Sequence, residues 1–219
     1  MPLVGEPETE QFAQAIQEFL AEESKPTKRK PAHAAPSGLV TILFTDMEGS
    51  TSLTQRLGDA AAQDLLRTHN AIIRDALKAH HGSEIKHTGD GVMASFSTAS
   101  KALECAVAIQ TAFAERNAGV GAGLAPPKGA ASGAPTPLEL LLVRIGLNAG
   151  EPVAEDQDLF GTAVQLAARV CARAEPGQVL AANVVRELAM GKGFLFSDQG
   201  DVVLRGFEDP VRLYEVRWG

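Results

Sequence analysis

The sequence predicts an α+β domain in which a sheet packs against helices. Three observations support this. Residues 39–45 form a continuous apolar, β-branched run that is typical of a central strand. Residues 84–96 place two apolar runs on either side of a glycine-rich turn, which is the pattern of a β-hairpin. Residues 52–80 and 99–117 carry apolar side chains at helical spacing, so an amphipathic helix should follow the first strand and another the hairpin.

Length, composition and charge indicate one catalytic-size domain. The 219 residues, of which 45% are hydrophobic, can bury one sizeable core but leave no room for two large domains. A net charge of −7 argues against a general nucleic-acid binder, which needs a basic face. Cys105 and Cys171 each lie in a helix-like pattern, which favours buried thiols in a reducing compartment over a disulfide or metal site.

The chain shows no sign of membrane insertion or export. No apolar run approaches the roughly 18–20 residues that span a bilayer, and the acidic N-terminus lacks the charged and apolar regions of a signal peptide. We therefore expect a cytoplasmic protein without a membrane span.

The N-terminal region divides into two segments before the main domain. Residues 1–24 should contain an amphipathic helix, which either packs on the main domain or serves in dimerisation or signal transmission. Residues 25–37 carry four basic residues and three prolines, and we expect a solvated spacer rather than a contact with an anionic surface. The catalytic-size domain then occupies residues 38–219.

The first strand ends in a turn that suits phosphates. Asp46 follows the apolar run, and Gly49 permits close approach of the backbone. Ser50 or Thr51 can cap the next helix, so the turn should present free N–H groups beside an acidic side chain.

The hairpin supplies a second carboxylate. Ile85, Val92, Ala94 and Phe96 alternate as in half-buried strands, and Gly89 and Gly91 should provide positive-φ positions around Asp90. Taken alone, Asp90 is either a turn residue or a ligand. Two carboxylates at the ends of neighbouring strands, beside a phosphate-binding turn, would hold hard cations such as Mg²⁺ and with them a nucleoside triphosphate.

The remaining elements complete a βαββαβ order. Residues 52–80 should form one long helix or a pair broken at Gly58, with His69, His80 and His81 exposed or at the helix end and without chemical roles. Residues 118–137, almost entirely Gly, Ala, Pro and Ser, should form a flexible insertion. A buried strand at 138–149 follows. The expected C-terminal elements are a helix at 161–174, a strand at 178–181, a helix at 184–190 and strands at 194–197, 202–204 and 211–218.

This order of elements predicts a ferredoxin-like sandwich, with helices on one face of the sheet and a C-terminal αβ addition. Three segments also carry a family resemblance: 44–51 (FTDMEGST), 86–91 (KHTGDG) and 160–169 (FGTAVQLAAR). In this order and at comparable spacing, they resemble the catalytic domain of class III adenylate/guanylate cyclases. The resemblance covers roughly residues 38–218, and it implies the nucleotide cyclase fold.

The resemblance implies a reaction in which the ribose 3′-hydroxyl of ATP attacks the α-phosphate, giving 3′,5′-cyclic AMP and pyrophosphate. It assigns Asp46 and Asp90 as ligands of two metal ions, Mg²⁺ or Mn²⁺, and adds the main-chain carbonyl of Met47. Gly49, Ser50 and Thr51 would contact the phosphates. Metal ions in such a site acidify the attacking hydroxyl and neutralise the leaving phosphates.

Base recognition in the resembled family involves a lysine and an aspartate, here Lys86 and Asp158. Adenine offers an acceptor at N1 and a donor at N6, so a lysine donor and an aspartate acceptor complement it, whereas guanine presents the opposite pattern. This favours ATP. Lys86 can equally be an edge lysine, and Asp158 is one of several acids in its segment.

Arginine residues would bind the phosphates. Arg169 matches the family arginine that stabilises charge on the α-phosphate. Four residues earlier, where the family usually carries asparagine to orient the ribose, this chain has Gln165, which leaves rate and sugar positioning in question. Arg144 and Arg205 fall near basic positions that bind the triphosphate, and Arg205 stands where lysine is common.

The resemblance further implies a head-to-tail homodimer with two shared sites. The metal aspartates of one subunit would face Lys86, Asp158, Gln165 and Arg169 of the other. Two alternatives remain open at this point. One is a cyclase-like module that binds nucleotide or a partner with little turnover; the other is a cyclase acting on GTP or a pyrimidine triphosphate.

Overall fold

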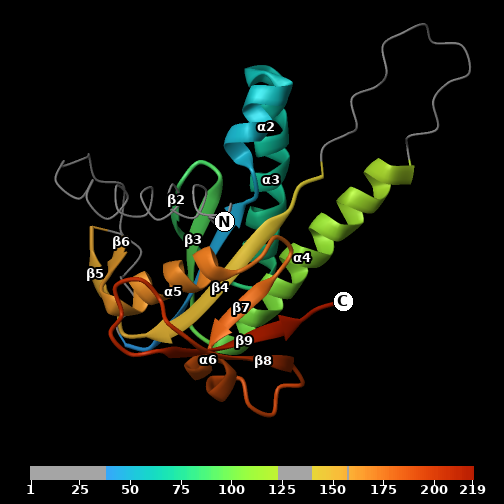
Figure 1. Cartoon of the computed structure of the whole chain (residues 1–219). Coiled ribbons are helices and arrows are strands. Elements are labelled where there is room, and N and C mark those ends of the chain that lie inside the picture. The colour runs from blue at the N-terminus through green and yellow to red at the C-terminus, as the bar shows by residue number, and fades with distance from the viewer. Residues whose placement is uncertain (1–37, 123–139, 157) are drawn as a thin grey trace, which may run out of the picture.

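The computed structural model describes residues 38–122, 140–156 and 158–219. A seven-stranded sheet runs in the order β2-β3-β1-β4-β7-β9-β8, and a separate hairpin pairs β5 with β6 (Figure 1). The large sheet comprises β1 (Val40–Met47), β2 (Ser83–His87), β3 (Gly91–Phe96), β4 (Val143–Gly150), β7 (Val179–Ala182), β8 (Leu195–Val202) and β9 (Val211–Arg217). The remaining elements are β5 (Val153–Glu155), β6 (Asp158–Phe160), α2 (Ser50–Leu57), α3 (Asp59–Ala79), α4 (Ala99–Ala122), α5 (Thr162–Arg173) and α6 (Asn183–Leu188).

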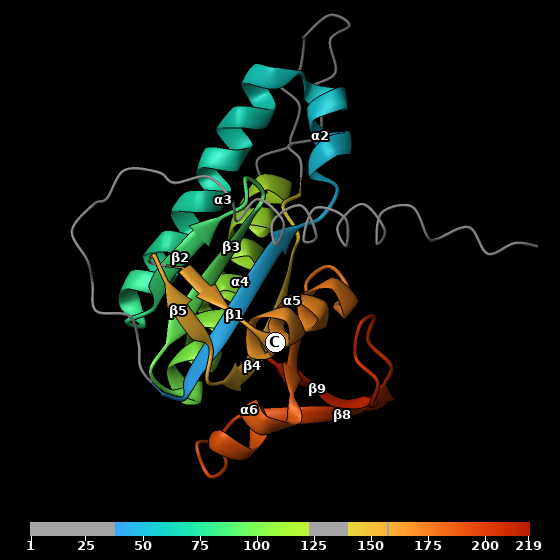
Figure 2. The same cartoon turned by 90° about the vertical axis from the view of Figure 1, so that its left-hand side faces the viewer.

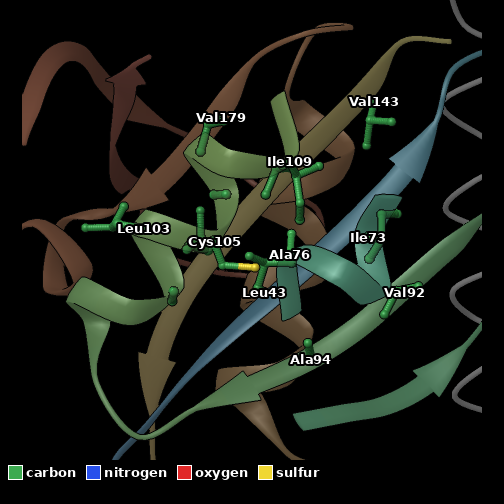
Figure 3. Packing of buried hydrophobic residues seen from close by; sticks show 14 of the residues in the cluster. Leu43, Ile73, Ala76, Val92, Ala94, Leu103, Cys105, Ile109, Val143 and Val179 are labelled. Carbon is green, nitrogen blue, oxygen red and sulfur yellow. The ribbon is translucent and has the colours of Figure 1, made fainter. Parts of the chain in front are cut away.

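The ferredoxin-like βαββαβ core is confirmed. Its four strands lie in the order β2-β3-β1-β4, with antiparallel pairing of β1 to both β3 and β4. Helices α3 and α4 cover one face of these strands, where Leu43 of β1 meets Ile73 of α3 and Ile109 of α4 in the largest buried cluster (Figure 3). Each fully buried aliphatic side chain of this kind stabilises the fold by about 1.5–3 kcal/mol.

The expectation that helices occupy one face holds for this core and fails for the C-terminal addition. Helix α5 packs on the opposite face, where its apolar residues meet Ile42 and Phe44 of β1 (Figure 2). It lies very close to β4: a Cβ atom at Gly146 would stand 2.1 Å from the backbone nitrogen of Cys171. The missing side chain at Gly146 therefore allows the helix that carries Gln165 and Arg169 to rest directly on the sheet.

Several expected boundaries differ from the structure. Helix α4 continues to Ala122, so the expected insertion from residue 118 begins later, and its residues 123–137 lie outside the described part. The two expected strands at 194–197 and 202–204 are one strand, β8, and the β5–β6 hairpin was not predicted. Strand β3 is buried along its whole length rather than on one face, because helices cover both sides of the sheet. The expected segments 1–24 and 25–37 also lie outside the described residues.

Two expectations for single side chains have opposite outcomes. Cys105 and Cys171 are free and buried, as predicted. His69, predicted to be exposed, is fully buried on α3. It follows Leu65 and precedes Ile73 by one helical turn each, so it belongs to the stripe that faces the core. Of the two arrangements expected for residues 52–80, the broken pair is confirmed, with Gly58 between α2 and α3. In the described part of the chain, no helix combines the length and apolar character needed to cross a membrane.

Candidate active site

Strand pairing brings the two candidate metal ligands together. In the β1–β3 ladder Asp46 lies opposite Gly91, the residue after Asp90, and the backbone N–H of Met47 donates to the carbonyl of Asp90 at 3.0 Å. Burial raises the pKa of Asp46 most, and the negative charge of Asp90 raises it further. The prediction that the strand end and the hairpin tip converge is confirmed.

The hairpin tip depends on two glycines for different reasons. Gly89 has φ +94°, as predicted for a tight turn. Gly91 does not have positive φ, contrary to expectation, and is needed for close approach instead. A Cβ atom at Gly91 would lie 2.3 Å from the carbonyl oxygen of Thr45. The side chain of Thr45 also accepts a hydrogen bond from the N–H of Val92 at 3.0 Å, which holds the base of the hairpin tip against β1.

Asp46 is a buried carboxylate with an arginine partner. Only 3% of the residue is exposed, and Arg144, its neighbour in the β1–β4 ladder, contacts Oδ2 through Nε at 2.7 Å and through a terminal guanidinium nitrogen at 2.6 Å. Burial raises the pKa of Asp46 to about 6; the charge of Arg144 opposes this rise, and that of Asp90 adds to it. The buried pair therefore only partly offsets the desolvation of the carboxylate.

Asp90 is held by the turn that follows β1. The hydroxyl of Ser50 donates to Oδ2 of Asp90 at 2.5 Å. Gly49, with φ +63° and ψ +28°, is the N-cap of α2, and no side chain caps the helix. The expected capping by Ser50 or Thr51 is therefore wrong, because Ser50 instead reaches across to the hairpin. Thr51 is exposed in the first turn of α2.

Lys86 and Asp158 meet although 72 residues separate them. The Nζ atom of Lys86 lies 3.3 Å from Oδ2 of Asp158, and both side chains are mostly buried. Lys86 belongs to β2, and Asp158 opens β6 in the hairpin that the sequence did not predict. The other carboxylate oxygen accepts the N–H of Leu159 at 2.8 Å, which fixes the orientation of Asp158. The pairing of these two predicted residues is thus found within one chain.

The third group consists of Arg169 and Arg205. Burial lowers the pKa of Arg169, and the positive charge of Arg205 lowers it further, so the two cations are electrostatically coupled. No described carboxylate forms an ion pair with either arginine. Gln165 is exposed one turn earlier on α5. Two neighbouring cations of this kind form a local site for an anion.

A pocket of about 230 Å³ lies between Asp90 and the helices α2 and α3. Its lining residues are Met47, Ser50, Leu53, Thr54, Asp59, Ala62, Gln63, Leu66 and Asp90. Both partners of the Ser50–Asp90 hydrogen bond therefore line this pocket.

The donor set fits a hard divalent cation. Asp46 and Asp90 supply oxygen atoms, the preferred ligands of Mg²⁺ and Mn²⁺, and a bound cation would offset the burial and the mutual repulsion that raise the pKa of Asp46. Among the described residues, no cluster of three or more His, Cys, Asp or Glu side chains suits a metal. Further ligands would come from the backbone, as at Met47, or from substrate.

Comparisons with known proteins identify relatives of most of the chain. The family model of the adenylate and guanylate cyclase catalytic domain matches residues 32–217. A Rhizobium meliloti protein, provisionally named adenylate cyclase 3, is 32% identical over 177 residues, which make up 80% of this chain and 28% of that protein. The chain therefore spans just over a quarter of that relative.

Solved structures show the same fold. The crystal structure of an adenylate/guanylate cyclase/hydrolase from Silicibacter pomeroyi is 33% identical, with a TM-score of 0.65 over 83% of this chain and 98% of that one. A guanylyl cyclase crystal structure is 25% identical, with a TM-score of 0.65 over 83% and 94% of the two chains. The chain belongs to the family of adenylate and guanylate cyclase catalytic domains.

Proposed function

We propose that this chain is an adenylate cyclase that converts ATP to 3′,5′-cyclic AMP and pyrophosphate. The observation that carries the proposal is the convergence of Asp46 and Asp90 beside the turn at residues 49–51. Bound Mg²⁺ or Mn²⁺ ions, two per site, would acidify the ribose 3′-hydroxyl and neutralise the triphosphate. Asp46, Asp90 and the Met47 carbonyl would hold them.

The Lys86–Asp158 pair supports adenine as the base. N1 and N6 are neighbouring positions on the ring edge, so a donor and an acceptor held 3.3 Å apart can meet both at once. Guanine would direct its N1–H at the ammonium group and its O6 at a carboxylate, which leaves buried polar groups unpaired. A guanylyl cyclase is among the similar solved structures, so GTP is the competing substrate.

The basic residues would serve the phosphates in different ways. Arg169 would donate hydrogen bonds to charge that develops on the α-phosphate, since its planar fork is always protonated. Arg205 would bind the phosphates beside it, and Arg144 would do so by leaving Asp46. Gln165 would orient the ribose from the turn preceding Arg169. Backbone N–H groups and hydroxyls at Gly49, Ser50 and Thr51 would contact the leaving phosphates.

The assay measures products from ATP, GTP, CTP and UTP with Mg²⁺ or Mn²⁺. We expect cyclic AMP, and a preference for ATP over GTP of at least about tenfold in kcat/KM, because a base mismatch costs roughly 1–3 kcal/mol. Asp46→Ala and Asp90→Ala should each fall below about a tenth of wild-type activity. Asp64→Ala, which removes an exposed carboxylate on α3, is the matched control. Equal use of ATP and GTP would remove Lys86 and Asp158 from base recognition.

We further propose a head-to-tail homodimer in which each site combines the carboxylates of one chain with Arg169 of the other. Asp46→Ala and Arg169→Ala homodimers would each have two damaged sites, whereas their heterodimer would keep one intact. Random exchange makes half of the dimers mixed, so up to about a quarter of wild-type activity should return on mixing. Proven subunit exchange without recovery would contradict the shared sites.

A further inference from the structure

Two histidines that the proposed reaction does not use have buried ring nitrogens without hydrogen-bond partners. Nε2 of His69 and Nε2 of His87 are the two such side-chain atoms found in the described part of the chain. His69 is fully buried on α3 against Phe113, with ring centroids 5.6 Å apart, and His87 is the last residue of β2. A buried, unpaired polar group costs about 1–3 kcal/mol, so an apolar residue would serve packing alone better.

The partners of the other ring nitrogens define the tautomers. Nδ1 of His87 lies 3.1 Å from the backbone nitrogen of Gly89, which can only donate, so Nδ1 is the acceptor and Nε2 carries the proton. Nδ1 of His69 lies 3.0 Å from Oδ1 of Asn70, which can only accept, so here Nδ1 carries the proton and Nε2 is bare. The unpaired atoms are therefore complementary: a donor on His87 and an acceptor on His69.

His69 is electrostatically coupled to the hairpin tip. Burial lowers the pKa of His69, the hydrogen bond with Asn70 and the charge of Asp90 oppose this, and the charge of His87 lowers it further. Asp90 lines one pocket together with Ala62 and Leu66 of α3, so this helix lies beside the hairpin tip.

His87 is joined to Asp90 by a short series of contacts. Its ring accepts the N–H of Gly89, and the carbonyl of the next residue, Asp90, accepts the N–H of Met47. We propose that His87 is a positioning residue for Asp90: by accepting the Gly89 amide, the ring fixes the turn that presents the carboxylate. The kinetic part of its test rests on the proposed function, and the structural part does not.

Two substitutions separate the hydrogen bond from mere packing. His87→Asn keeps an acceptor near the position of Nδ1, since asparagine side chains accept the N–H two residues ahead. His87→Leu keeps apolar volume and removes the acceptor. If the leucine variant does not fold, His87→Gln is used in its place, because the glutamine carbonyl lies one bond further out. His80→Leu is the matched control, because His80 contacts Glu104 rather than the hairpin.

The first readout is hydrogen exchange of the Gly89 amide, followed by NMR. Loss of one hydrogen bond should accelerate exchange at least about fivefold in His87→Leu, with less than about a twofold change in His87→Asn and in the control. The second readout is the split between KM for Mn²⁺ and KM for ATP. We expect KM for Mn²⁺ to rise about fivefold or more in His87→Leu while KM for ATP stays within about twofold of the wild-type value. His87→Asn should restore the wild-type KM for Mn²⁺.

Unchanged Gly89 exchange in the leucine or glutamine variant would overturn the proposal, as would failure of asparagine to restore exchange and KM for Mn²⁺. A parallel rise in KM for ATP would also overturn it, because general loosening of the site would then explain the result. If the wild-type protein made no cyclic nucleotide, the proposed function would fail, and Gly89 exchange together with Mn²⁺ binding, measured by electron paramagnetic resonance, would still decide the role of His87.

Discussion

Asp46 should make the metal-free protein less stable as the pH rises. Burial raises its pKa from the ordinary value of 3.8 to about 6, so the folded state binds the proton more tightly than the unfolded state. The stabilisation is fully present below pH 3.8 and is lost as the pH rises through about 6. The shift corresponds to about 3 kcal/mol in total, of which about 1.4 kcal/mol is lost between pH 5 and pH 8.

Urea unfolding in EDTA across pH 5–8 measures this effect. Asp46→Asn is the reference because it removes the titrating group, and Arg144 stays charged throughout. The free energy of unfolding of the wild type, relative to this variant, should fall by about 1.4 kcal/mol across the range. A difference that is constant or grows with pH would refute the reasoning. At pH 8, Mn²⁺ at about 100 times its Kd should stabilise the wild type by about 2.7 kcal/mol and the variant far less.

Three further variants test the site. Gly91→Ala should destabilise the protein by about 3 kcal/mol or more in urea unfolding, because the added Cβ would overlap a carbonyl group of β1. Gly200→Ala is the comparison: open space surrounds Gly200, so this variant should lose about 1–2 kcal/mol. Similar losses of stability in the two variants would contradict the close approach of Gly91 to β1. Gln165→Asn, which restores the side-chain length usual in the family, should raise kcat by roughly threefold in a cyclic AMP assay; a lower kcat would show that the site is built for glutamine. Lys86→Met should reduce the preference for ATP over GTP, measured as kcat/KM, to below about threefold.

The sequence predicted those parts of the site that lie on strongly patterned elements. The apolar run before Asp46 and the glycine-bounded turn around Asp90 are local signals, and the pairing of β1 with β3 follows from the βαββαβ order. Asp158 is different. Each strand of its hairpin has three residues, and the turn between them includes Asp156 at φ +45°, so the acidic segment resembled a loop.

Side-chain partnerships across the sheet could not be predicted. Ser50 binds Asp90 from 40 residues away, and Arg144 binds Asp46 across 98, through rotamers that no sequence periodicity encodes. The burial of His69 was accessible in principle, because its spacing from Leu65 and Ile73 continues the apolar stripe of α3. The expectation was wrong because the position of His69 on the helix, and not the polarity of its side chain, decides its burial.

On the proposed function, the charges of the site would favour a nucleotide together with metal over either alone. Arg144 forms an ion pair with Asp46. A cation bound at Asp46 would displace the guanidinium group of Arg144, which could then pair with an anion. Arg169 and Arg205 already repel each other, and a triphosphate would relieve that repulsion. Metal at Asp46 and phosphate at Arg144 would therefore favour each other, because both compete with one ion pair. On this reasoning, Arg144→Met would weaken the dependence of Mn²⁺ affinity on a non-reactive ATP analogue, and binding titrations with and without the analogue would measure that coupling directly.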